Sequence, residues 1–289
     1  MKISGFTIIK NAVINDYPIV EAITSVLPVV DEMIVLIGDS SDNTVDLIKS
    51  ISSDKIKIHH SVWDKSLRKG GEVLAVETNK AFQLINPDST WAFYIQADEA
   101  VHEKDHAAIL EACRKYKDDT RVQGLLFKYI HFYGTYDYVG DSRKWYRNEV
   151  RIIRNDKAIS SYKDAQGFRV GEKKLRVKEI NASVYHYGWV KSPEQMTRKI
   201  KEVSQYWHEG EEWEHSFLSE QLFDYNEFDS LRLFKGIHPK VMQKRIDQQS
   251  WSFKIDLSRK RFSFRDALLY RIERATGIRL FDFRNYKKI

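Results

Sequence analysis

Hydrophobic and polar positions follow a regular order along the first hundred residues, in which short apolar runs alternate with amphipathic segments. The run MIVLI at 33–37 is continuously hydrophobic, which is typical of a strand buried on both faces of a parallel sheet. The runs at 3–9, 56–60 and 91–95 also predict strands. The segments between them predict helices at 18–27, 45–51 and 72–85. This order predicts an α/β fold with a doubly wound sheet.

Local signals support two of these helices. Pro28 follows the first amphipathic segment and is expected to end that helix. The polar stretch GDSSDNT precedes the second, and either Ser41 or Asp42 is expected as its N-cap.

The pattern changes after residue 120. Apolar runs at 124–133, 150–154 and 174–187 predict further strands of a mixed sheet, and no Pro/Gly/Ser-rich linker separates them from the first part. We therefore expect residues 1–190 to form one domain. Ser192 and Gln195 form a capping box around Pro193, which predicts that residues 191–289 are a helical extension. The basic, aromatic tail at 251–289 could pack back on the domain, form a partner interface or lie on an anionic membrane surface, and packing back is expected.

Composition sets limits on the class of protein. The 289 residues are 42% hydrophobic and 30% charged, which is typical of a globular protein, and the net charge is +6. No apolar run approaches the ~18 residues that span a bilayer, and the first residues resemble a strand rather than a signal peptide. Cys113 is the only cysteine, which excludes a disulfide framework within the chain. A cytoplasmic protein is expected, with peripheral contact at the inner membrane face through the basic tail as an option.

Polar clusters follow two of the expected strands. Residues 38–42 (GDSSD) come after the second strand, and residues 96–99 (QADE) come after the fourth. Ligands of open α/β sheets bind at the carboxyl ends of the strands, so these clusters are expected on one edge. The carboxylate of Asp98 suits a divalent cation held against a diphosphate. An acidic pair after a strand is also a common cap, so the pair alone does not decide between the two interpretations.

Residues 3–190 resemble family 2 glycosyltransferases of the GT-A fold, in particular the branch of lipopolysaccharide-core glucosyltransferases. In that family a strand ends in DADE, and the second Asp holds the metal of a nucleotide sugar. Here the place reads QADE, so Asp98 matches that Asp and Gln96 replaces the first carboxylate. The segment VLIGDSSDNT at 35–44 is similar to the family's VVDTGSTDNT. The family's nucleoside-binding Asp corresponds to Ile37 in this sequence, and Asp39 lies two positions further on.

The resemblance implies roles for particular residues. Asp98 would bind Mn²⁺ or Mg²⁺, and His186 would complete its ligands, although a lone histidine at a strand end is also commonly structural. The residues expected to contact the nucleotide are Lys10, Asn11, Asp39, Asp42, Asn79, Lys80 and Gln96.

Inverting transfer also needs a carboxylate that takes the proton of the acceptor hydroxyl. Asp164, in the polar loop SSYKDAQGF, is expected to be this base, and Glu149 is the second candidate. The alternative for each is an exposed acid or an ion pair with a neighbouring arginine.

The expected function is therefore transfer of a hexose from a nucleotide diphosphate sugar to a glycan or glycolipid acceptor, in synthesis of a cell-surface polysaccharide or lipopolysaccharide. Gln96 and Ile37 keep open a second hypothesis, a catalytically inactive glycosyltransferase-like domain that binds glycans or a partner. A nucleotidyltransferase would need a glycine-rich phosphate loop near the first strand, and the stretch IIKNAVIND has none. The sequence contains no recognised nucleic-acid-binding motif, so no nucleic-acid partner is expected.

Overall fold

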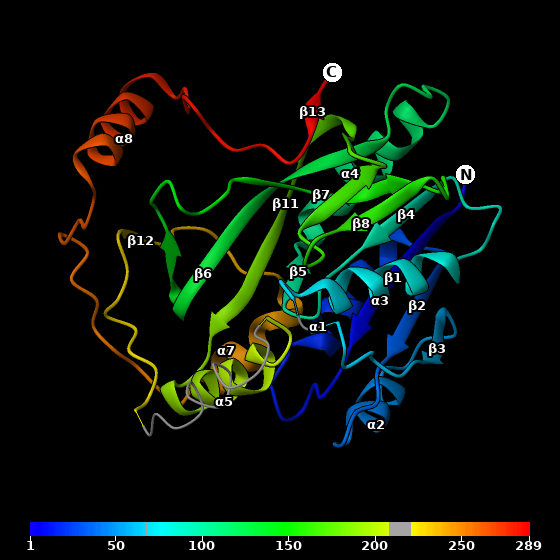
Figure 1. Cartoon of the computed structure of the whole chain (residues 1–289), viewed down its shortest axis with the longest axis horizontal. Coiled ribbons are helices and arrows are strands. Elements are labelled where there is room, and N and C mark those ends of the chain that lie inside the picture. Colours follow the sequence, from blue (N-terminus) through cyan, green and yellow to red (C-terminus); the bar gives the residue numbers. More distant parts are fainter. Residues whose placement is uncertain (68, 208–220) are drawn as a thin grey trace.

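The first part of the chain forms the expected parallel sheet with helices on its faces (Figure 1). A computed structural model of the protein describes residues 1–67, 69–207 and 221–289. The strands of this part are β1 (Ile3–Ile9), β2 (Glu32–Ile37), β3 (Ile56–His60) and β4 (Trp91–Tyr94). The helices are α1 (Ile19–Val26), α2 (Thr44–Lys49), α3 (Glu72–Gln83) and α4 (His106–Tyr116), with 3₁₀ turns at Leu27–Val29 and Glu103–Asp105.

The strand pairing of this half is parallel throughout. β1 lies between β2 and β4, and β3 pairs with the outer edge of β2. Each strand therefore ends at the same edge of the sheet, as the alternation of strands and helices predicts.

The second part extends the sheet with mixed pairing. The added strands are β5 (Glu99–Val101), β6 (Gly124–Gly140), β7 (Asn148–Arg154) and β11 (Arg176–Val190). β7 is antiparallel to β4 and to β6, whereas β11 runs parallel to β6 and antiparallel to β5. The expected fold class, a Rossmann-like, GT-A-like doubly wound mixed sheet, is confirmed by the strand order β11-β6-β7-β4-β1-β2-β3.

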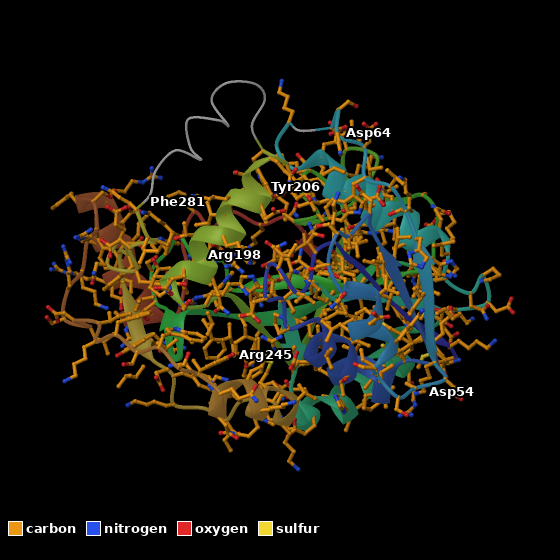
Figure 2. All side chains as sticks on the ribbon, turned by 90° about the horizontal axis from the view of Figure 1, so that it is seen from below. Asp54, Asp64, Arg198, Tyr206, Arg245 and Phe281 are labelled. Carbon is orange, nitrogen blue, oxygen red and sulfur yellow. The ribbon has the colours of Figure 1, made fainter. Side chains whose placement is uncertain are left out.

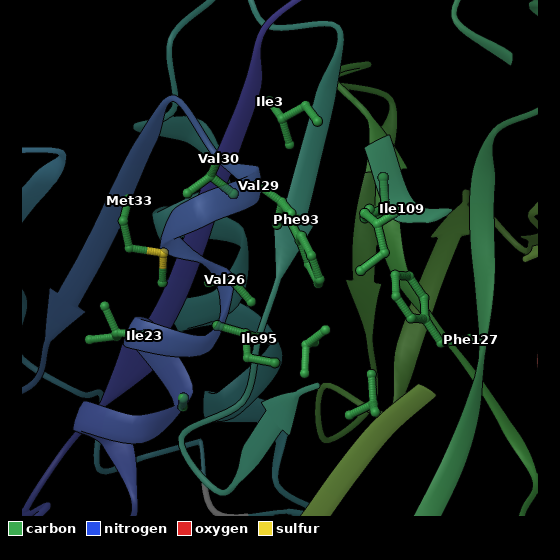
Figure 3. Packing of buried hydrophobic residues seen from close by; sticks show 14 of the residues in the cluster. Ile3, Ile23, Val26, Val29, Val30, Met33, Phe93, Ile95, Ile109 and Phe127 are labelled. Atoms are coloured by element: carbon green, nitrogen blue, oxygen red, sulfur yellow. The ribbon is translucent and has the colours of Figure 1, made fainter. Parts of the chain in front are cut away.

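Two apolar clusters lie on opposite faces of this sheet. One packs α1 and α4 against the sheet through side chains that include Ile23, Ile109 and Phe127, which are fully buried (Figure 3). The other includes Phe6, Phe82 and Phe168 and covers the face that carries α3 and a small sheet of β8 (Ile159–Tyr162), β9 (Gly167–Val170) and β10 (Lys173–Lys174). Burial on both faces explains why β2, which is buried along its whole length, is almost continuously apolar.

Several sequence-based expectations need correction. The N-cap of α2 is Asn43, not Ser41 or Asp42, although the Asp42 carboxylate does accept the Thr44 amide proton at 3.0 Å. The strand expected at 174–187 is split between β10 and β11, and β6 extends seven residues beyond 133. α4 and β5 were not predicted: α4 buries only Ile109, Ala112 and Cys113, and β5 is three residues long, so the local signal of each is weak.

The residues after 190 include helices and strand additions. The capping box at Ser192 and Gln195 is confirmed and begins α5 (Pro193–Ser204). The remaining elements are β12 (Leu231–Leu233), a 3₁₀ turn (Lys240–Met242), α7 (Gln243–Asp247), α8 (Phe264–Thr276) and β13 (Lys287–Lys288). β12 pairs with β6 and β13 with β11, so the chain returns to the main sheet twice. The division at residue 190 stays a prediction, and part of the extension, 208–220, lies outside the described residues.

The tail contacts the rest of the protein at several places, beginning with Trp251, whose Nε1 donates to the Gly134 carbonyl at 3.0 Å. Glu273 of α8, which is buried, pairs with Arg143 at 2.7 Å and also with Arg147, and Tyr286 before β13 is buried. The expectation that the tail packs back on the domain is confirmed at these points. No helix in the described part of the chain has the length and apolar character needed to span a membrane.

Candidate active site

The carboxyl ends of β1 and β4 open into a cavity of about 290 Å³. The end of β11, the β8–β9 loop and α5 close its other sides. Five of the residues singled out in the sequence line it, although they are spread over the chain, and these are Lys10, Gln96, Asp98, Asp164 and His186.

Strand register places Asp98 beside His186. β5 begins at Glu99 and pairs with β11 so that Glu99 lies opposite His186. The Tyr187 amide donates to the Asp98 carbonyl at 2.8 Å, which fixes the turn before β5. Asp98 Oδ2 then lies 3.8 Å from His186 Nε2.

Gly188 leaves a small space between these two side chains. A Cβ atom at this position would lie 2.6 Å from Asp98 Oδ2 and 2.6 Å from His186 Nε2. Glycine thus keeps open a point that both polar atoms face, and any larger residue would fill it.

The protonation of the pair follows from its surroundings. Burial by itself would raise the pKa of Asp98, but the positive charge of Lys199, a smaller contribution from His186 when that ring is protonated, and the hydrogen bond from Lys199 to the carboxylate outweigh burial and lower this pKa to about 2. Burial lowers the pKa of His186 below its usual value, although Asp98 opposes the shift. At neutral pH the pair is therefore a carboxylate and a neutral imidazole.

This donor set fits a divalent cation that takes its other ligands from a diphosphate. Oxygen from Asp98 and nitrogen from a neutral His186 are ligands that Mn²⁺ accepts. His186 Nδ1 is buried and has no hydrogen-bond partner among the described residues, so none of them fixes the tautomer of the ring. Within residues 1–67, 69–207 and 221–289, however, no three His, Cys, Asp or Glu side chains converge as a complete metal site. The described residues therefore offer two ligands, and a bound ion would need others.

The second acid of the QADE segment has a different environment. Glu99 is fully buried and accepts from the guanidinium of Arg151, with Arg151 Nε 2.9 Å from Glu99 Oε2. Glu99 also accepts hydrogen bonds from the Tyr129 hydroxyl and from the backbone amide of Gln96, the latter at 3.0 Å. Arg151 in turn donates to Gln96 Oε1 at 3.4 Å. Gln96 is thus a neutral acceptor for Arg151, and Glu99 is a structural residue beneath the cavity.

Asp164 lies in the cavity wall, in the loop between β8 and β9. Lys163 and Ala165, on either side of it, have positive φ angles of 54° and 61°, a conformation that non-glycine residues seldom adopt outside tight turns and functional loops. Gln166 donates to Asp164 Oδ1 at 2.8 Å. The loop geometry therefore holds the carboxylate at the cavity.

Glu149 lies below the cavity and does not line it. Its side chain is buried on β7, and Oε2 is 3.4 Å from Arg151 Nη1. Burial raises the pKa of Glu149 to about 7. The positive charge of Arg151 acts to lower this pKa, and the negative charge of Glu99 acts to raise it. This value suits a proton acceptor, but the Glu149 side chain does not line the cavity.

Lys10 and Asp39 form the opposite end of the site. Lys10 Nζ donates to Asp39 Oδ1 at 2.8 Å and lies 5.7 Å from the centre of the Trp63 ring. The Trp63 amide donates to the same Asp39 oxygen at 3.1 Å. Burial acts to raise the pKa of Asp39, but these hydrogen bonds lower it overall. Lys10 and Trp63 line the cavity. Asp39 does not line it but accepts a hydrogen bond from each of them.

Four other residues expected near a nucleotide are not in the cavity wall. Asn11 accepts from the Ser41 amide at 2.8 Å, and Asp42 accepts from the Val13 and Ile14 amides. Asn79 accepts from the Ser161 amide at 2.7 Å. Lys80 pairs with Glu77 at 2.6 Å. Their contact with a nucleotide stays a prediction.

The sequence analysis did not identify several side chains that line the cavity. Tyr17, Lys199, Tyr206 and Trp207 all do so, and the last three come from α5 and the turn after it. Figure 2 shows Arg198 on α5 and Tyr206 at the end of this helix. The Tyr206 and Trp63 rings lie 5.2 Å apart, which gives the cavity an aromatic side. The strong capping box of α5 predicted the helix, but no local pattern indicates which of its faces meets the sheet.

Comparisons with known proteins give distant structural similarity. No protein-family model matches the chain, and no curated protein matches its sequence. S. aureus TarS 1–349 is 15% identical, with 70% of this chain and 64% of that chain covered and a TM-score of 0.38. Glucosyl-3-phosphoglycerate synthase from Mycobacterium tuberculosis, solved with Mn²⁺ and UDP, is 19% identical over 46% of this chain and 45% of that one, with a TM-score of 0.31.

A third similar structure is 4-diphosphocytidyl-2C-methyl-D-erythritolsynthase from Anaerococcus prevotii, 12% identical over 68% of this chain and 94% of that one, with a TM-score of 0.40. The chain spans less than two thirds of the TarS 1–349 structure that it matches. The function therefore has to be inferred from this chain's own residues.

Proposed function

We propose that the protein is an inverting glycosyltransferase that moves a hexose from a nucleotide diphosphate sugar to a glycan or glycolipid acceptor. The observation that carries this proposal is the meeting of Asp98, Asp164 and His186 in one cavity, from three separate parts of the chain. The QADE and SSDNT segments, which resemble those of family 2 glycosyltransferases, support the same reading.

In this proposal the nucleotide lies toward Lys10 and the diphosphate toward Asp98. The aromatic side formed by Trp63 and Tyr206 offers a stacking surface for a base. Asp98 and His186 would hold Mn²⁺ or Mg²⁺, which when bound would offset the negative charge of the diphosphate.

Asp164 is proposed as the base. The acceptor hydroxyl attacks the anomeric carbon, the bond from that carbon to the diphosphate oxygen breaks, and the hydroxyl proton passes to the Asp164 carboxylate. Gln166 and the constrained loop would orient this carboxylate. Glu149 is the second candidate, and its buried position favours a supporting role.

The test is turnover of a panel of UDP-, GDP-, CDP- and dTDP-sugars with Mn²⁺, measured as released nucleoside diphosphate with and without added glycan or glycolipid acceptors. We expect Asp164→Asn to lower transfer at least a hundredfold while nucleotide binding persists, because the variant lacks the proton acceptor. Asp156→Asn, in the exposed loop before β8, is the matched control and should behave as wild type. Equal transfer by both variants would remove Asp164 from the reaction. Nucleotide binding without any turnover would favour the alternative, an inactive glycan- or partner-binding domain.

We also propose that the protein acts in the cytoplasm, in synthesis of a cell-surface polysaccharide or lipopolysaccharide, and that its tail contacts the inner membrane face. Phe264, Phe281 and Phe283 are 90%, 82% and 72% exposed, in a segment rich in arginine. Figure 1 shows α8 at the outer edge of the molecule, and Figure 2 shows Phe281 at the end opposite Asp54. Aromatic side chains beside cationic ones suit the interface of an anionic bilayer.

Sedimentation with vesicles tests this contact. Vesicles of phosphatidylglycerol and phosphatidylcholine should retain the wild type, and the double variant Phe264→Ser/Phe281→Ser should remain in the supernatant. Val62→Ser, which alters a residue 73% exposed in another part of the chain, is the control. Equal retention of all three proteins would argue against the contact.

A further inference from the structure

Lys199 of α5 makes a direct ion pair with the proposed metal ligand. Its Nζ donates to Asp98 Oδ2 at 3.1 Å and to the Gly188 carbonyl at 2.9 Å. The side chain is 15% exposed, and the ammonium lies 4.8 Å from the centre of the Tyr17 ring. A helix that begins directly after β11 therefore supplies a cation to the centre of the cavity.

The contact is made to the same carboxylate oxygen that faces His186. Asp98 Oδ2 accepts from Lys199 and is also the Asp98 atom nearest to His186 Nε2 and to the space at Gly188. A divalent cation held by Asp98 and His186 would compete with the ammonium for this oxygen. It would also be repelled by the ammonium at short range, where solvent screens charge poorly.

The charges of the site explain when this competition would be relieved. Asp98 and Lys199 neutralise each other, so a divalent cation added alone would leave two uncompensated positive charges in a partly buried place. The diphosphate of a nucleotide sugar carries two negative charges. The cation and diphosphate together therefore restore neutrality, whereas the cation by itself does not.

Lysine has the reach needed to change partner. Its ammonium is carried by a flexible stem of four carbons, unlike the rigid fork of arginine. Lys199 lines the cavity described above and also an adjoining one of about 380 Å³. The walls of the second cavity are mostly apolar, with Trp189, Met196 and Ile200 among them, so a displaced ammonium has its favourable partners in the first.

We propose that Lys199 is the resident counter-cation of Asp98 in the nucleotide-free protein and that it turns to the diphosphate when the donor binds. Asp98 then takes the divalent cation only together with the diphosphate. This inference rests on the proposed function for its second part, because it assigns Lys199 a role in donor binding. Its first part, the competition at Asp98, is independent of which nucleotide binds.

Titration of Mn²⁺ alone, followed by the loss of the free-ion electron paramagnetic resonance signal, tests the first part. Lys199→Met keeps a side chain of similar length but removes its charge. This variant should bind Mn²⁺ about tenfold more tightly than wild type. Lys201→Met, on the same helix but outside both cavities, is the matched control and should match wild type. Adding Asp98→Asn to Lys199→Met should abolish the gain. Equal or weaker Mn²⁺ binding by Lys199→Met would overturn the proposal.

A second arm compares nucleoside diphosphates with monophosphates in the presence of Mn²⁺, by calorimetry. Lys199→Met should weaken the affinity for the preferred one of UDP, GDP, CDP and dTDP about tenfold, since it loses a charge-assisted hydrogen bond, and should change monophosphate affinity less. Lys199→Arg should recover most of the diphosphate affinity. Uniform weakening for both kinds of nucleotide would overturn the diphosphate role.

The two parts fail in different ways. If no nucleotide binds the wild type while Lys199→Met gains Mn²⁺ affinity, the proposed function fails and the counter-cation role stands. If nucleotides bind but Lys199→Met changes neither Mn²⁺ nor diphosphate affinity, the proposed function stands and Lys199 is only a structural partner of Asp98. Lys199→Gln, which keeps a hydrogen-bond donor, replaces the methionine variant if circular dichroism shows that the latter does not fold.

Discussion

The edge at β1 and β2 and the corner where β4, β11 and α5 meet contain the same kinds of polar residue, but they use them differently. At the first, the Asp42 carboxylate accepts from the amides of Val13, Ile14 and Thr44, which leaves it occupied by the protein's own backbone. At the second, Asp98 and His186 face an open space, and His186 Nδ1 has no hydrogen-bond partner among the described residues. An acid held by several backbone amides stabilises a loop, whereas Asp98, whose partner is the flexible side chain of Lys199, can exchange that partner for a ligand.

The neighbouring acids Asp98 and Glu99 show the same difference within two residues. Glu99 is fully buried and paired with Arg151, which anchors the floor of the cavity. Asp98 lines the cavity itself. Substitutions can therefore separate the stability of this corner from its ligand binding.

The largest effect is expected from Arg151→Met. Removing the guanidinium leaves Glu99 charged and buried without its partner, which should lower the free energy of unfolding by about 3–5 kcal/mol. Urea denaturation measures this loss. The control is Arg121→Met, since Arg121 pairs with Asp119 at the surface with its side chain 78% exposed, and it should change little. A similar loss in both variants would contradict a structural role specific to the buried pair.

Asp42→Ala should have the next largest effect. Backbone amides of Val13 and Ile14 lose their acceptor, and we expect a loss of about 2 kcal/mol in the free energy of unfolding with nucleotide affinity unchanged. Asp46→Ala, at an exposed position of α2, is the control. Weaker nucleotide binding at unchanged stability would instead support the contact between Asp42 and a nucleotide that the sequence predicts.

Gly188→Ala should affect the corner without affecting the fold. The added methyl group would occupy the space 2.6 Å from Asp98 Oδ2 and His186 Nε2, so Mn²⁺ in the presence of nucleoside diphosphate should bind about tenfold more weakly, a change of about 1.4 kcal/mol. The melting temperature without ligand should stay close to that of wild type. Unchanged Mn²⁺ binding would place the cation elsewhere.

The smallest effect, taken per pH unit, is a pH dependence that comes from Glu149. Its pKa is raised by burial to about 7 in the folded protein and is near 4.5 when unfolded, so the folded state binds more protons between these values. Stability should therefore fall as pH rises through this window, with a slope on the order of 1 kcal/mol per pH unit. Glu149→Gln should lack this slope when unfolding is measured at pH 5 and pH 7. Parallel pH profiles for the two proteins would show that Glu149 titrates normally.

The sequence predicted the frame of the molecule better than the details of its site. Apolar runs predicted the strands from 3–9 to 91–95, and the local signal is clearest in β2, which is buried along its whole length. The rule that strand ends share an edge brought Lys10 and Asp98 to one cavity.

Other features depend on tertiary contacts that have no local pattern. Nothing in the QADE segment distinguishes Glu99, which is committed to Arg151 52 residues away, from the cavity-facing Asp98 beside it. Lys199 is likewise an ordinary helix lysine in the sequence, and only the packing of α5 against β11 brings it to Asp98 across 101 residues.

The most direct test of the donor site is the thermal shift of the wild type and of Asp98→Ala with UDP, GDP, CDP and dTDP, each with and without Mn²⁺. If the corner of β4, β11 and α5 binds a nucleotide diphosphate through a cation, one nucleotide should raise the melting temperature in a Mn²⁺-dependent way, and the variant should lose that rise. No shift with any nucleotide, or an equal Mn²⁺-dependent shift in Asp98→Ala, would contradict the assignment of Asp98 as the metal-binding residue of a glycosyltransferase.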